Sequence, residues 1–149
     1  MKTAISAALL AASALASPAS ATDLVRVDSP HGVAETSDRL AAAVEKAGAR
    51  IFARIDHAKG AESIGSPIPA AEVLIFGNPA LGTPVIAEAP EAGLDLPLRV
   101  FVHDRNGQTV MVYRAPAAIA AAHGVADDHP AIAKMTGALG TLTAAAAAE

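Results

Sequence analysis

The stretch that decides the fold is Glu72-Val73-Leu74-Ile75-Phe76-Gly77-Asn78-Pro79. Its apolar β-forming residues follow one another without alternation, which predicts a strand covered on both faces. Gly77 suits a sharp exit from that strand because it has no Cβ. Asn78 followed by Pro79 is typical of a capped helix start.

A second helix-start signal, Thr83-Pro84, follows a few residues later. Pro84 would break a helix that had begun at Pro79, because proline has no amide hydrogen to donate. The sequence leaves both starting points open. In either case the short helix is expected to end before Pro90.

Residues 1–21 have the pattern of a secretory signal peptide. Lys2 provides the basic start, a run of small apolar residues extends from Ala4 to Ala16, and Ala19-Ser20-Ala21 fits the cleavage pattern. Predicted cleavage after Ala21 leaves one domain, residues 22–149, in a bacterial periplasm or outside the cell. No later apolar run is long enough to insert into a membrane.

Charge and cysteine content exclude several classes of function. Removal of Lys2 reduces Lys plus Arg from 11 to 10 against 15 Asp plus Glu, so the net charge changes from −4 to −5. This acidity argues against a nucleic-acid partner. The chain contains no cysteine, which excludes disulfides, thiolate nucleophiles, cysteine metal sites and a lipid anchor on cysteine.

The remaining patterns predict strands and helices in an order that is not a strict alternation. Residues 24–27 are expected to form a strand and residues 33–47 an amphipathic helix. Residues 49–56 alternate as a strand, with Ile51 and Ile55 on one face and Phe52 among charged residues on the other. The order favours an α+β fold: a single small domain with helices packed on a mixed or antiparallel sheet of about five strands.

Asn106-Gly107 predicts a tight hairpin between residues 96–104 and 108–114. In the expected register Arg105 pairs with Gln108. One face of the hairpin then carries the expected core residues, namely Leu98, Val100, Val102, Met111 and Tyr113. The other face is mixed and suits a partly covered surface or a dimer contact; its residues are Arg99, Phe101, His103, Val110, Val112 and Arg114. A short helix is expected from Pro116, and a final helix from Pro130, after the helix-start residue His129.

Histidines are the main candidates for site chemistry: His31, His57, His103, His123 and His129. No two are spaced i, i+4 on a helix, and no HExxH pattern is present, so a metal site would need distant segments. His57 follows Asp56 at a predicted strand end, where a carboxylate can orient an imidazole. Neighbouring strand residues point to opposite sides, so a purely structural role for His57 stays open. No serine elbow, phosphate loop or other catalytic set appears.

Several short motifs resemble the domain of unknown function 302 family. They are Ile55-Asp56-His57-Ala58, Phe76-Gly77-Asn78-Pro79, Gly82-Thr83, Asp95-Leu96-Pro97-Leu98 and the Asn106-Gly107 hairpin leading to Tyr113. The resemblance covers nearly all of the mature chain, from about Val27 to Leu142. It implies a small α+β domain, often exported in bacteria, and no biochemical activity that can be carried over.

We therefore expect a binding module for a small ligand or a metal, with no catalytic residue and no cofactor identified. Its site would lie where the Asp56-His57 turn and the Gly77-Asn78-Pro79 turn come together. The candidate ligand-binding residues are Asp56, His57, Phe76, Gly77, Asn78, Pro79, Leu96 and Pro97, and the candidate metal ligand is His57. The alternative is a homodimeric interaction domain, suggested by Phe52 and Phe101 on charged strand faces. A third hypothesis is an acid–base enzyme that uses His57.

Overall fold

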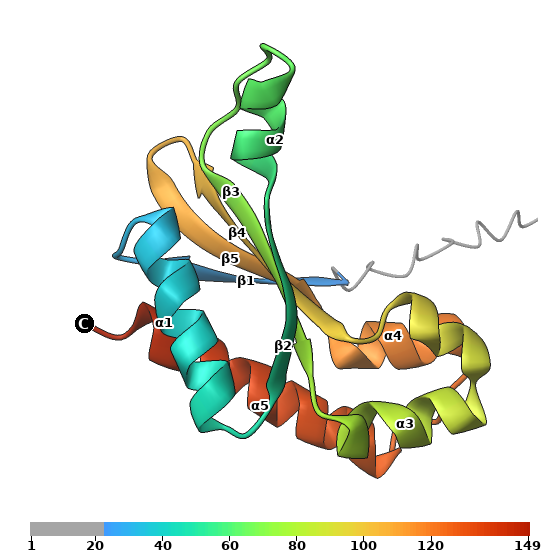
Figure 1. Ribbon diagram of the computed structural model, residues 1–149. Helices are drawn as coiled ribbons and strands as arrows, with labels where there is room; N and C mark the ends of the chain where they lie inside the picture. Colours follow the sequence, from blue (N-terminus) through green and yellow to red (C-terminus); the bar gives the residue numbers. More distant parts are fainter. Residues whose placement is uncertain (1–22) are drawn as a thin grey trace, which may run out of the picture.

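The computed structural model describes residues 23–149 (Figure 1). The signal-peptide prediction for residues 1–21 lies outside these residues. Five strands form one sheet: β1 (Leu24–Ser29), β2 (Arg50–Asp56), β3 (Ala71–Gly77), β4 (Leu98–Arg105) and β5 (Gln108–Arg114). Their order is β1-β5-β4-β3-β2, and every neighbouring pair is antiparallel.

The helices are α1 (Val33–Lys46), α2 (His57–Ser63), α3 (Pro79–Glu88), α4 (Pro116–His123) and α5 (Pro130–Ala147), with the 3-10 helix η1 (Pro90–Leu94). In Figure 1, α1 and α5 lie along the sheet, α2 projects from one end of it, and α3 and α4 lie at the other end. The α+β prediction is confirmed. Among the described residues, none of the helices is both long and apolar enough to span a membrane.

The core lies between the sheet and the helices α1 and α5. Its largest fully buried side chains include Leu40 of α1, Leu74 and Phe76 of β3, and Met135 and Leu139 of α5. All five hairpin residues expected in the core are buried, namely Leu98, Val100, Val102, Met111 and Tyr113. The amphipathic pattern of residues 33–47 therefore predicted correctly which surface the first helix buries.

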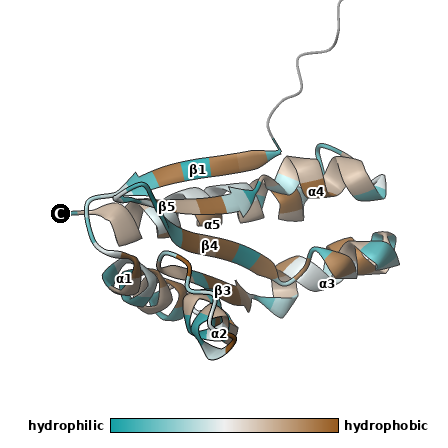
Figure 2. Cartoon of the chain, turned by 90° about the horizontal axis from the view of Figure 1, so that it is seen from above, coloured by the Kyte–Doolittle hydropathy of each residue, from teal (hydrophilic) through white to brown (hydrophobic). Residues whose placement is uncertain are grey.

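The opposite face of the sheet is open. Val73 and Ile75 of β3, Phe101 of β4 and Val112 of β5 are only half-buried there, and Figure 2 shows apolar segments, in brown, in β1 and β4. The prediction that the run from Val73 to Phe76 is covered on both faces is wrong. The side chains of Leu74 and Phe76 alternate with those of Val73 and Ile75, and only the first pair reaches the core.

Strand β2 contains a β-bulge. Ile51 pairs with Phe76, and the next pair joins Ala53 to Ile75, so Phe52 is the extra residue. Before the bulge Ile51 packs against the core, whereas after it Ile55 is 44% exposed. The predicted continuous alternation over residues 49–56 is therefore wrong, because the bulge exchanges the two faces.

The two turns with strong local signals form as expected. Asn106 and Gly107 have φ values of 57° and 88°, and Arg105 pairs with Gln108, as a tight hairpin requires. The alternative starting points of α3 are resolved in favour of Asn78-Pro79: the Asn78 side chain accepts a hydrogen bond from the Ala80 amide, and Pro84 lies inside the helix. His129 likewise caps α5 through the Ala131 amide.

Candidate functional site

The two turns that the sequence analysis placed in one site lie at opposite ends of the sheet. Strands β2 and β3 are antiparallel neighbours, with Arg50 opposite Gly77 and Asp56 opposite Glu72. The chain therefore leaves β2 at one end and β3 at the other. The prediction that Asp56-His57 and Gly77-Asn78-Pro79 form a common site is wrong, because motifs at two successive strand exits are separated by the length of an antiparallel pair.

At the first of these turns, Asp56 and His57 make separate contacts. The Oδ1 atom of Asp56 accepts a hydrogen bond of 2.8 Å from the Lys59 amide and caps α2. The His57 ring meets Phe101 edge to face, with 5.8 Å between ring centroids, and Phe101 stacks on His103 at 4.9 Å. Asp56 thus orients the helix start rather than the imidazole.

We expect Asp56→Ala to loosen α2 alone. An N-cap aspartate contributes about 1 kcal/mol, and none of the residues of α2 is buried, so the helix opens without unfolding the core. Hydrogen exchange of the Lys59 amide should speed up about fivefold, with little change in the melting temperature. Asp56→Ser should restore most of the protection. A large drop in the melting temperature of Asp56→Ala would contradict this local role.

Within residues 23–149, three or more His, Asp and Glu side chains nowhere come together in an arrangement that could hold a metal ion. His57 therefore has no set of co-ligands among the described residues. Its assignment as a metal ligand stays a prediction from the sequence.

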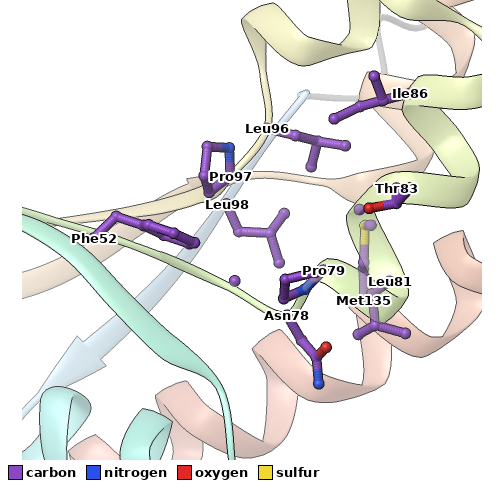
Figure 3. Close-up of a pocket in the computed structure, with 12 residues that line it drawn as sticks. Phe52, Asn78, Pro79, Leu81, Thr83, Ile86, Leu96, Pro97, Leu98 and Met135 are labelled. Atoms are coloured by element: carbon purple, nitrogen blue, oxygen red, sulfur yellow. The ribbon is translucent and has the colours of Figure 1, made fainter.

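The other end of β3 borders a pocket of about 220 Å³. Figure 3 shows Phe52 and Pro97 on one side, Thr83 and Met135 on the other, and Leu98 between them. The twelve lining residues come from β2, the β3–α3 turn, α3, the start of β4 and α5: Phe52, Gly77, Asn78, Pro79, Leu81, Gly82, Thr83, Ile86, Leu96, Pro97, Leu98 and Met135. Five of the eight candidate residues, Gly77, Asn78, Pro79, Leu96 and Pro97, thus lie in one place.

The β-bulge explains how Phe52 reaches this pocket. As the extra residue of β2 it belongs to neither regular face, and its ring lies beside Gly77. A Cβ at Gly77 would lie 3.4 Å from Pro97 Cβ and 3.7 Å from a ring carbon of Phe52. Glycine therefore lets Pro97 and Phe52 approach the strand closely. Phe76, the neighbouring candidate, is 2% exposed and belongs to the core.

The pocket is apolar in its depth and polar at its edge. Leu98 and Met135 are buried, whereas Asn78 and Thr83 are exposed. The side-chain Oδ1 atom of Asn78 accepts a hydrogen bond of 2.9 Å from the Ala80 amide. The side-chain nitrogen Nδ2 of Asn78 has no hydrogen-bond partner within residues 23–149, so it can donate to a ligand at the rim.

Two ion pairs of Arg54 join β2 to its neighbours β3 and α1. Arg54, just after the bulge, pairs with Glu72 at 2.8 Å and with Asp38 of α1 at 2.5 Å. Hydrogen bonds to Glu72 first, and then to Asp38, raise the pKa of the Arg54 guanidinium above its usual value. Because arginine already stays charged throughout the ordinary pH range, these contacts hold β2 to α1 without acting as a pH switch.

The sequence analysis missed one pair of polar side chains. Asp95 forms a hydrogen bond of 2.8 Å with His123 at the end of α4. The His123 side chain is only 10% exposed. No local signal predicts this pair, since 28 positions separate the two residues along the chain.

The architecture defines a class of protein: a small α+β domain with a helix-covered antiparallel sheet and an apolar pocket at one sheet end. The chain belongs to the family described as domain of unknown function DUF302, whose model matches residues 25–142. A crystal structure of an uncharacterized conserved DUF302 protein from Bacillus stearothermophilus shares the fold, with a TM-score of 0.69 and 21% identity. That match covers 85% of this chain and 97% of the other.

Similar curated proteins include two from Brucella named fluoride-specific ion channel FluC 1. The Brucella suis protein is 40% identical over 129 residues, which is 85% of this chain and 50% of that protein. The Brucella abortus protein is also 40% identical over 129 residues, covering 47% of its length. The present chain thus spans about half the length of these curated relatives.

Proposed function

We propose that this protein is an exported binding module for a small apolar ligand held at the end of β3. The observation that carries the proposal is the apolar pocket, deepest at Leu98 and Met135, with Asn78 and Thr83 at its rim. The signal-peptide pattern of residues 1–21 supports export.

The dimensions of the pocket favour a ligand about the size of one substituted ring. Its volume of about 220 Å³ exceeds the roughly 150 Å³ of an apolar protein cavity that binds benzene. A hydroxyl or carbonyl on the ring would meet Asn78 or Thr83 at the rim, where a few placed polar groups orient a ligand in an otherwise apolar site.

The experiment is a binding series on residues 22–149 with toluene, benzyl alcohol and phenol. A ligand at 100 times its Kd should add about 2.7 kcal/mol, which raises the melting temperature by several degrees. Backbone amide shifts in NMR should change around Asn78 and Gly82. Sodium fluoride is compared with sodium chloride, because the Brucella relatives are named fluoride channels. Unchanged spectra at saturating aromatic ligand would reject the proposal.

A second candidate function is self-association through the open sheet face. Contiguous apolar surface on one side of an antiparallel sheet is typical of an interaction site. Here Ile55 is 44% exposed, beside half-buried Val73, Ile75, Phe101 and Val112. The four spacings between the five strands, at about 4.8 Å each, make this face about 19 Å wide.

We expect light scattering after size exclusion to report a dimer that Ile55→Asp converts to a monomer. The substitution places a charge on the apolar face, which is costly when the contact buries that charge without a partner. Ile64→Asp is the matched control, because Ile64 is 79% exposed and follows α2 away from the face. A wild-type monomer at the highest soluble concentration would exclude this candidate.

A further inference from the structure

Three arginines gather on the open sheet face, at the end nearest α4. Arg26 of β1 pairs with Val112 of β5, and the β4–β5 pairing ends at Phe101 and Val112. Arg99 and Arg114 each lie two residues beyond that last pair. Because side chains alternate along a strand, both belong to the same face as Phe101 and Val112.

Arg114 lines two neighbouring hollows. One, of about 200 Å³, is lined by Asp95, Leu98, Arg99, Arg114 and Ile119. The other, of about 330 Å³, is lined by Asp23, Leu24, Arg26 and Arg114. Each hollow is therefore lined by two arginines from adjacent strands.

Each hollow is lined by one carboxylate against two arginines: Asp95 lines the first and Asp23 the second. Asp95 makes its short contact with His123 at 2.8 Å, while the Nε atom of Arg114 stands 3.9 Å from the other oxygen of Asp95. Arg99 donates a hydrogen bond to the backbone carbonyl of Leu94, which is uncharged. Like charges on neighbouring strands are unfavourable. An anion between the arginines would relieve this repulsion, even though the protein is acidic overall.

We propose that the Arg99–Arg114 hollow binds a small oxyanion, a carboxylate or a phosphate group. A guanidinium presents parallel N–H donors that match two oxygens of such a group. Arg99 and Arg114 would each donate to the anion, and Arg26 would add to the positive field. This hollow and the apolar pocket at the end of β3 share Leu98 in their linings, but the proposed anion contacts are arginines, so anion binding does not depend on a ligand in the pocket.

The experiment is an NMR titration of residues 22–149 with sodium phosphate, and separately with sodium acetate, at constant ionic strength. Constant ionic strength is needed because salt screens exposed charges. The Nε–H signals of Arg99 and Arg114 should shift and saturate. Arg99→Gln and Arg114→Gln should each weaken binding about tenfold, whereas Arg105→Gln, an exposed hairpin residue, should leave it unchanged.

Asp95→Asn should strengthen anion binding, whereas the arginine substitutions should weaken it. It removes the negative charge in the hollow and keeps the shape of the side chain, so phosphate should bind severalfold more tightly. A simple loss of folding would not produce this gain. Equal, unsaturated shifts at all arginines, or no gain in Asp95→Asn, would overturn the proposal.

A second arm separates a free anion from a lipid headgroup. Vesicles of phosphatidylcholine and phosphatidylglycerol in equal parts are compared with vesicles of phosphatidylcholine alone in a sedimentation assay. Phosphate binding without sedimentation identifies a soluble anion, while sedimentation with the anionic vesicles that is lost in Arg114→Gln identifies a headgroup. Gly82→Leu, at the apolar pocket, should change neither readout.

Discussion

Phe76→Ala should lower the free energy of unfolding by about 3–5 kcal/mol, the cost of truncating a fully buried phenylalanine. Phe76 is 2% exposed and is among the largest fully buried side chains of the protein. Its ring lies on the helix-covered face of β3, and its removal leaves a cavity that the sheet cannot close. Since a domain is stable by roughly 5–15 kcal/mol in total, the variant should be near its limit of stability.

Phe52→Ala is the matched control for this measurement. Phe52 is 48% exposed and borders the pocket, so its truncation should cost about 1 kcal/mol or less. Urea denaturation of both variants checks the comparison, with the midpoint and the slope fitted together. Similar costs for the two substitutions would contradict the assignment of Phe76 to the core and Phe52 to the site.

Local sequence signals predicted the elements on which the fold depends. The Asn106-Gly107 hairpin, the Asn78 cap and the His129 helix start each rest on residues within a few positions of one another. Such signals act through backbone conformation and neighbouring hydrogen bonds. They require no knowledge of distant partners, and the structure contains all three.

The bulge at Phe52 could not be predicted from the alternation of residues 49–56. A bulge depends on how β2 pairs with β3, and that register is a tertiary property. Its consequences are large: Ile55 moves to the open face, Arg54 reaches Asp38 of α1, and Phe52 reaches the pocket. The bulge thereby explains why Phe52 stands among charged residues in the sequence of β2: its ring lines the pocket.

Five of the eight candidate residues line one pocket, and the other three lie elsewhere. Gly77, Asn78 and Pro79 were expected to meet Asp56 and His57, but the antiparallel direction of β2 and β3 puts the two turns at opposite ends of the sheet. Pro97 does lie against Gly77, and Leu96 lines the same pocket, because β4 pairs with β3 at that end. Met135 of α5 is buried and also lines the pocket. Sequence patterns identified the residue types, whereas the strand order determined which residues meet.

Gly82→Leu should abolish binding of benzyl alcohol in the apolar pocket without destabilising the protein. Gly82 lies in α3 and lines the pocket, and a Cβ built there meets no atom within 4 Å. A leucine side chain can therefore occupy the space that the ligand would take. Leucine also favours a helix over glycine by up to about 1 kcal/mol, so the melting temperature should stay equal or rise.

Gly140→Leu separates occlusion of the pocket from the change in helix propensity. Gly140 lies in α5, is exposed, and likewise has open space for a Cβ. It should gain similar helix stability and keep wild-type affinity, as measured by the same NMR titration. If both variants bind benzyl alcohol as the wild type does, the ligand does not occupy this pocket. If both lose binding, the effect comes from the helices and the pocket has no special role.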